Sequence, residues 1–182
     1  IGYTAQRPVH FFAKAPLFDV PVFGALMHAL GMVPAYRGQD DKAAVRKNLA
    51  TLDVGTKYLG RGEAVGIFPE GKTHDREGLE QVRTGAARIA WPAVQNGTAV
   101  MIVPLGLNYA RKESFRSAIW VRVGEPLDAQ AWLGARSEEE RRAIRSLTEE
   151  IDRRLKQVVI HLHEERWQPF LPELELLLPS TG

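Results

Sequence analysis

The stretch from Ala64 to Gly71, Ala-Val-Gly-Ile-Phe-Pro-Glu-Gly, constrains the fold of this 182-residue chain more than any other. Residues 64–68 form an uncharged apolar run, which predicts a buried strand. The strand must end at Pro69, which has no N–H for a sheet ladder, and Gly71 accepts backbone angles that other residues resist. The sequence therefore predicts that Glu70 is held at the rim of a sheet by a stiff turn. The alternative is an ordinary turn between a strand and a helix, because Pro and Gly are common in any loop.

Apolar strands and helices alternate along the rest of the chain, which predicts an α/β fold with a mostly parallel central sheet flanked by helices. The expected strands are 9–13, 32–36, 64–68, 100–107 and 119–123, and the expected helices are 17–30, 39–59, 79–94 and 137–162. Pro21 is expected to kink or delay the first helix, and Ser137 with Glu140 predicts a capping box at the start of the last. The length favours a single domain over 1–182, with 137–182 as its C-terminal helical segment.

The composition excludes several classes of protein. A hydrophobic content of 45% and a charged content of 25% are ordinary for a globular protein, and a net charge of +2 is too small to indicate nucleic-acid binding. The chain has no Cys, which excludes disulfides, thiolate catalysis and cysteine metal sites, and fits a reducing compartment. No run approaches 18 apolar residues, so no transmembrane span is predicted.

Three charged side chains follow predicted strands. Ligands of open α/β sheets bind beyond the carboxyl ends of the strands, and this rule places Lys14, Arg37 and Glu70 at one rim if the strands are parallel. Arg can contact two phosphate oxygens at once, Lys adds a point charge, and Glu can orient donors. The set suits a phosphate beside a hydroxyl. The alternative is that Lys14 and Arg37 only solvate the ends of loops.

Other chemistries find little support. The chain has no G-x-S-x-G elbow, Walker loop or H-E-x-x-H motif. His161 and His163 are two residues apart on a predicted helix, so they cannot share a face as metal ligands, and no metal site is expected. His74 beside Asp75 fits either a base with its orienting acid or a capped loop, and the loop is the simpler interpretation.

Several ordered blocks carry a resemblance to a known family. They are a Gly followed by a short apolar run closing on Arg (Gly31 to Arg37), Phe-Pro-Glu-Gly (Phe68 to Gly71), and an apolar strand with Val-Pro (Ile102 to Leu107). In these blocks the chain resembles the PlsC-type glycerophospholipid acyltransferases. Phe68 to Arg76, Gly106 to Tyr109, Phe115 to Ser117 and Gly124 to Pro126 resemble the yeast-type glycerol-3-phosphate/dihydroxyacetone-phosphate branch. The resemblance covers about Arg7 to Pro126.

The resemblance implies transfer of a fatty acyl group from acyl-CoA or acyl carrier protein to glycerol-3-phosphate or 1-acylglycerol-3-phosphate. It implies no cofactor and a position on the cytoplasmic side of a membrane, peripheral or anchored by segments outside this chain. The acceptor-binding residues that it implies are Lys14, Arg37, Phe68, Pro69, Glu70, Gly71, Lys72 and Thr73.

One block of the family pattern is absent. The catalytic His followed five positions later by Asp does not occur at any of the five histidines, and by the resemblance it is expected upstream of Ile1. The residues 1–182 would then be an acyltransferase domain without its N-terminal part. Two alternatives stay open: a phosphate- or lipid-binding module of the same fold without catalysis, and an unrelated α/β phosphate-binding enzyme. The apolar tail 167–178 is expected to cover the core, face lipid or contact a further domain.

Overall fold

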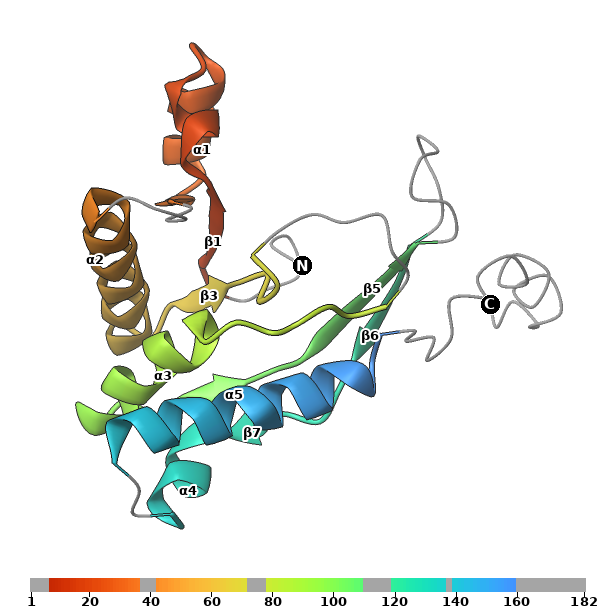
Figure 1. Cartoon of the computed structure of the whole chain (residues 1–182). Coiled ribbons are helices and arrows are strands. Elements are labelled where there is room, and N and C mark those ends of the chain that lie inside the picture. Colours follow the sequence, from red (N-terminus) through yellow and green to blue (C-terminus); the bar gives the residue numbers. More distant parts are fainter. Residues whose placement is uncertain (1–6, 37–41, 72–77, 110–118, 137–138, 160–182) are drawn as a thin grey trace, which may run out of the picture.

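Three parallel strands form the sheet that organises the structure. The computed structural model describes residues 7–36, 42–71, 78–109, 119–136 and 139–159 (Figure 1). In order, its elements are β1 (Val9–Lys14), the 3-10 helix η1 (Ala15–Asp19), α1 (Phe23–Ala29), β2 (Val33–Ala35), α2 (Lys42–Gly60), β3 (Ala64–Gly66), α3 (Gly85–Gln95), β4 (Met101–Ile102), β5 (Leu105–Tyr109), β6 (Ile119–Val123), β7 (Leu127–Asp128), α4 (Ala129–Gly134) and α5 (Glu140–Lys156).

β1 lies between β2 and β3, and both pairings are parallel. Lys14 is opposite Ala35 of β2, and Phe11 is opposite Gly66 of β3. Two antiparallel pairs, β4–β7 and β5–β6, complete the described strands. The predicted α/β fold with a parallel central sheet flanked by helices is confirmed.

The strand before the turn is shorter and less buried than predicted. Only Ala64–Gly66 pairs with β1, all three residues are half-buried, and Phe68 is 61% exposed. In the described part of the chain β3 has a neighbour on one side only, so it is an edge strand rather than the central one. Ile67 and Phe68 leave the ladder before Pro69 begins the turn.

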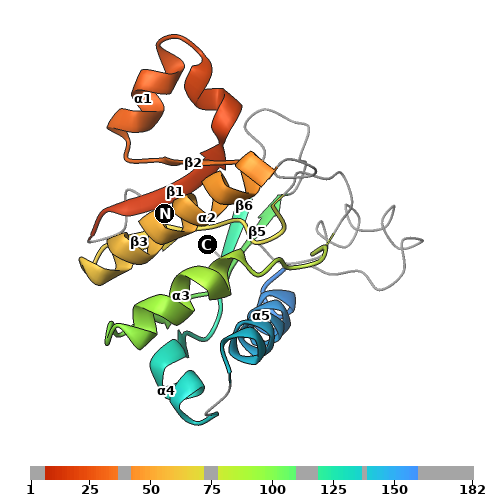
Figure 2. The ribbon, with the colours of Figure 1, turned by 60° about the vertical axis from the view of Figure 1, so that its left-hand side comes forward.

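The first predicted helix is split at Pro21. Residues 15–19 form η1 and residues 23–29 form α1, and the two pack together on a projection at the end of β1 and β2 (Figures 1 and 2). A Cβ on Gly24 would collide with the carbonyl oxygen of Phe18, so glycine allows this close packing. Gly31, with φ +68°, ends α1 as predicted, and its N–H donates to the His28 carbonyl at 2.9 Å.

Two other predicted elements differ in detail from the structure. α2 buries Thr51 and Gly55, whereas the larger, apolar Leu49 is 45% exposed. A Cβ on Gly55 would lie 3.1 Å from both Ile89 and Phe12, so small residues let α2 approach α3 and β1. The predicted strand 100–107 is interrupted at Val103–Pro104, because Pro104 cannot donate to a ladder. Its halves, β4 and β5, pair with different strands.

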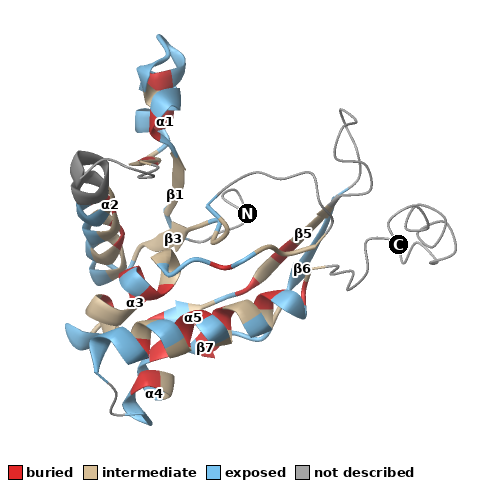
Figure 3. Cartoon of the chain, in the orientation of Figure 1, coloured by how far each residue is buried: buried red, intermediate tan, exposed pale blue. Residues whose placement is uncertain are grey.

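The main core lies between α3, α4, β7 and α5 (Figure 3). The apolar residues Leu147, Ile151 and Leu155 of α5 are buried, as is Val158 just after the helix, and Ile144 is packed against them. The helix begins at Glu140 with Glu139 as N-cap, so the predicted Ser137 cap is wrong, and residues 137–138 and 160–182 lie outside the described residues. Among the described helices, none has the length and apolar character needed to cross a bilayer.

Candidate functional site at the carboxyl edge of the parallel sheet

The carboxyl ends of the parallel strands meet at one edge, which is the condition for Lys14 and Glu70 to share a rim. Lys14 is the last residue of β1 and is exposed there. The Phe68–Gly71 turn follows β3 at the same edge, and the Phe11 and Phe68 rings, 6.5 Å apart, connect β1 to it. The structure therefore places Lys14 and Glu70 at one edge. Arg37 lies outside the described residues, just beyond β2.

The residues Pro69 and Gly71 determine the conformation of the turn. The Gly71 N–H donates to the Phe68 carbonyl at 3.2 Å, with Pro69 and Glu70 in the two central positions. Pro69 fixes one backbone angle of the turn, and Gly71 adopts φ +67°, a left-handed conformation that favours glycine. The stiff turn predicted for Glu70 is present, and Lys72 and Thr73, which follow it, lie outside the described residues.

Residues 79–84, predicted as the first turns of a helix, lie instead outside any helix and brace the turn through hydrogen bonds. The Glu80 N–H donates to the Glu70 carboxylate at 2.9 Å, and the Arg83 N–H donates to the Pro69 carbonyl at 2.8 Å. The Arg83 Nε–H donates to the Glu70 carbonyl at 3.3 Å. Backbone groups that would start a helix are used here, so α3 begins only at Gly85. The Glu70 carboxylate thus has a structural role in fixing the edge.

Phe68 is the exposed aromatic of this edge. A Cβ on Gly66 would occupy the position of the Phe11 ring, so the glycine lets Phe11 lie over β3 and contact Phe68. The edge therefore carries both an exposed aromatic ring, suited to a hydrocarbon or a thioester, and the ammonium of Lys14, suited to a phosphate.

The structure also contains a histidine–carboxylate pair that the sequence did not predict. His10 Nε2 lies 2.7 Å from the Glu63 carboxylate, and its Nδ1 lies 2.8 Å from the Gly31 carbonyl oxygen. Its ring stacks on Tyr58 with 3.7 Å between centroids. Both ring nitrogens face acceptors, so both are donors when the imidazole is protonated, and neither is available to accept a substrate proton. The pair joins β1 to the ends of α1 and α2 and is structural. Fifty-three residues separate its members, and no sequence spacing signals it.

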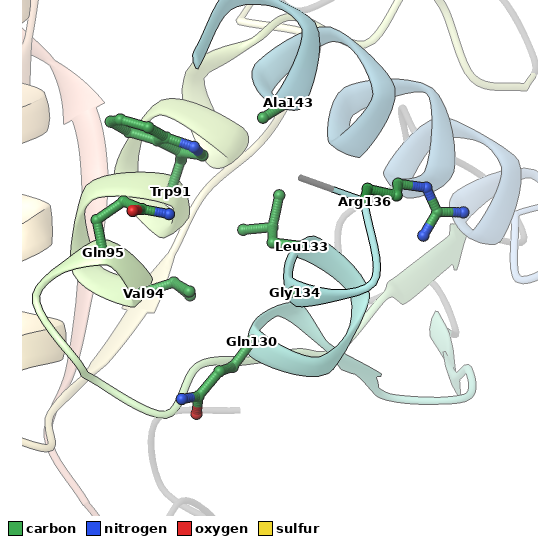
Figure 4. A pocket seen from close by; sticks show the side chains of 8 residues that line it. All are labelled: Trp91, Val94, Gln95, Gln130, Leu133, Gly134, Arg136 and Ala143. Carbon is green, nitrogen blue, oxygen red and sulfur yellow. The ribbon is translucent and has the colours of Figure 1, made fainter. Parts of the chain in front are cut away.

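Among the described residues, neither a group of metal ligands nor the pocket beside Trp91 involves the turn. Within the ranges that the structure describes, no three His, Cys, Asp or Glu side chains are grouped to hold a metal ion. A pocket of about 340 Å³ lies instead between α3, α4 and the start of α5, lined by residues that include Trp91, Gln95, Leu133 and Arg136 (Figure 4). It contains neither Lys14 nor any residue of the turn.

Comparison with known proteins decides the family. The model of the family described as Acyltransferase matches residues 1–108, more than half of the chain. The chain belongs to the acyltransferase family. Its matched region contains both Lys14 and the Phe68–Gly71 turn, so the resemblance drawn from the sequence is confirmed.

Curated relatives of this acyltransferase share part of its length. Glycerol-3-phosphate O-acyltransferase 1 of Saccharomyces cerevisiae is 33% identical over 57% of this chain and 14% of its own. Glycerol-3-phosphate O-acyltransferase 2 of the same yeast is 38% identical over 44% of this chain and 11% of its own. Lyso-ornithine lipid O-acyltransferase of Rhizobium meliloti is 33% identical over 58% of this chain and 35% of its own. The matched region thus spans only a small part, up to about a third, of these relatives.

Proposed function

We propose that this acyltransferase transfers a fatty acyl group from acyl-CoA or acyl carrier protein to glycerol-3-phosphate or 1-acylglycerol-3-phosphate. Membership of the acyltransferase family supports the reaction type. Two relatives named for glycerol-3-phosphate and one named for a lyso-lipid support an acceptor of this kind. The enzyme would work at the cytoplasmic face of a membrane, held peripherally or by segments outside this chain.

The observation that carries the proposal is the shared edge of Lys14 and the braced Phe68–Gly71 turn. An exposed ammonium at the carboxyl end of a parallel sheet can bind the acceptor phosphate, and Arg37 would add a two-pronged contact. The turn gives this edge a fixed shape because three hydrogen bonds from residues 80–83 hold it. Lys72 and Thr73, which follow the turn in the sequence, are proposed to belong to the same acceptor site.

The reaction itself needs a base. The acceptor hydroxyl gives up its proton, its oxygen forms an ester bond with the thioester carbonyl carbon, and the thiolate leaves with the proton. His10 cannot serve, because both of its nitrogens are engaged. The proposal therefore assigns proton transfer to a His and Asp upstream of Ile1. The second candidate, a binding module without catalysis, is favoured by the absence of that spacing within residues 1–182.

An assay of thiol release separates the two candidates. We expect the 182-residue chain, extended upstream to include a His followed five positions later by Asp, to release CoA from acyl-CoA only when glycerol-3-phosphate or its monoacyl form is added. Changing that His to Ala should abolish release without loss of acceptor binding. Acceptor binding with no turnover in the extended protein would indicate the binding module. Neither binding nor turnover with either acceptor would reject both candidates.

A further inference from the structure

The projection formed by η1 and α1 exposes apolar side chains to an unusual degree. Six large hydrophobic residues within positions 15–30 are exposed: Leu17, Val20, Val22, Phe23, Leu26 and Leu30. The same sixteen residues carry one formally charged side chain, Asp19. Soluble proteins rarely gather exposed apolar residues in this way unless the surface contacts a partner or a membrane.

Val22 at the tip is the most informative of these residues. Its φ of +66° and ψ of −49°, with the Phe23 N–H donating to the Pro21 carbonyl at 2.7 Å, define a γ-turn of the strained, positive-φ form. Glycine would adopt this conformation without strain, whereas a β-branched residue is an outlier there. The Val22 side chain is 86% exposed, so packing within the described structure does not explain it.

The projection is nevertheless a defined structure. Its inner side is formed by Ala15, Gly24 and Met27, which are buried, and the Phe18 and His28 rings meet edge to face at 4.9 Å. The ribbon of η1 and α1 extends away from the rest of the molecule (Figures 1 and 2), and the apolar residues named above are exposed on it. A narrow, apolar projection of this kind is suited to insertion rather than to a broad protein interface, which buries about 800 Å² on each partner.

We propose that the η1–α1 projection inserts into the surface of a phospholipid bilayer. Apolar side chains gain by entering the boundary between headgroups and acyl chains, and they need no shape-matched partner there. η1 follows Lys14 directly and contacts β1 and β2, so insertion brings the candidate site to the lipid surface. The inference rests on the proposed function and adds to it the surface that meets the membrane.

Vesicle binding tests the inference without any assay of catalysis. The 182-residue chain is sedimented with phosphatidylcholine vesicles, in parallel with Val22→Gly, which relieves the backbone strain, and Leu26→Gln, which preserves the helix. Val123→Gln on β6, a residue 63% exposed and remote from the projection, is the control. Thermal unfolding of each variant confirms that it is folded.

We expect both projection variants to bind at least about tenfold more weakly, because each removes buried CH₂ groups from the contact. The control should bind like the wild type, and high salt should change little because the projection has no cationic residue. Absent vesicle binding by the wild type, or equal binding by all variants, would overturn the inference. So would a dimer that the projection variants dissociate, which would identify a second copy as the partner. A third outcome separates this inference from the proposed function. If the 182-residue chain binds vesicles but the protein extended upstream transfers no acyl group, the proposed function is rejected and this inference stands.

Discussion

Among single residues, Gly71 shows most directly how the candidate site depends on backbone conformation. Its φ of +67° is left-handed, so Gly71→Ala should lower the free energy of unfolding by about 1–2 kcal/mol. Gly60→Ala is the control, because Gly60 has an ordinary φ and nothing within 4 Å of an added Cβ. Urea denaturation of both variants measures the difference, and equal stabilities would show that the turn is not constrained at Gly71.

Arg83 is expected to position the turn without contacting the acceptor. Arg83→Ala removes the Nε–H donor to the Glu70 carbonyl and should weaken glycerol-3-phosphate binding by about fivefold, the value of one hydrogen bond. Arg83→Lys keeps the charge but not this donor geometry, so it should show the same loss. Calorimetric titration compares both with Arg88→Ala, an exposed residue of α3. Full affinity in Arg83→Lys would show that only the charge matters.

The residues of the candidate site were predictable to the extent that local sequence determines them. Pro69 and Gly71 fix the turn, and the rule for parallel strands correctly put Lys14 and Glu70 at one edge. The brace from Glu80 and Arg83 was not predicted because the apolar spacing of residues 79–94 also fits a helix, and only the hydrogen bonds to the turn decide against a helix at residues 79–84. The His10–Glu63 pair depends on the register of β1 and β3, which no local pattern reveals.

At the level of secondary structure elements, the His10–Glu63 pair connects β1 to the segment between α2 and β3. The His10 side chain is 13% exposed, makes two hydrogen bonds and stacks on Tyr58. His10→Ala should therefore cost about 1–3 kcal/mol of stability. A double-mutant cycle with Glu63→Ala, read by chemical denaturation, isolates the pair. Additive effects of the two substitutions would show that the contact contributes nothing.

The charge network on α5 predicts a pH dependence of stability. Hydrogen bonding from Arg153, followed by Arg154 and opposed by partial burial, lowers the pKa of Glu150 from 4.5 to about 2. A lowered carboxylate pKa stabilises the fold above the unfolded value, and this contribution is lost as the pH falls from about 4.5 toward 2.

Glu150→Gln should accordingly lower stability by about 1 kcal/mol at neutral pH, a modest value suited to surface pairs, and by almost nothing near pH 2. Glu149→Gln is the control. Glu149 lies four residues before Arg153, a spacing that favours an ion pair on a helix, but Arg153 pairs with Glu150 instead. Denaturation curves across this pH range measure both variants. A loss for Glu150→Gln that does not change with pH would contradict the assignment.

The elements were predicted best where one apolar period extends over many residues. The buried apolar residues of α5, from Ala143 to Leu155, are of this kind. Predictions failed where small residues pack closely, as with Gly55 in α2, or where proline divides a continuous apolar run, as at Pro104; the break expected at Pro21 is present. In each case tertiary contacts or a missing N–H outweighed the pattern of hydrophobicity.

For the whole molecule, alternating strands and helices predicted the fold class, and the ordered blocks from Gly31 to Leu107 predicted the acyltransferase family. The projection of η1 and α1 was not foreseen. Its residues 17–30 have the spacing of one amphipathic helix, and only the break at Pro21 and Val22 turns their apolar side chains outward. Exposure depends on the whole structure, so it could not be derived from that spacing.

The most direct test of the account is calorimetric titration of glycerol-3-phosphate into the 182-residue chain and its Lys14→Ala variant. If the carboxyl edge of the sheet binds the acceptor phosphate, Lys14→Ala should weaken binding by about tenfold or more, since it removes a charge-assisted contact. Lys57→Ala, at an exposed position on α2, should bind like the wild type. Equal affinity of Lys14→Ala and the wild type, with both folded, would contradict the assignment of the acceptor site to this edge.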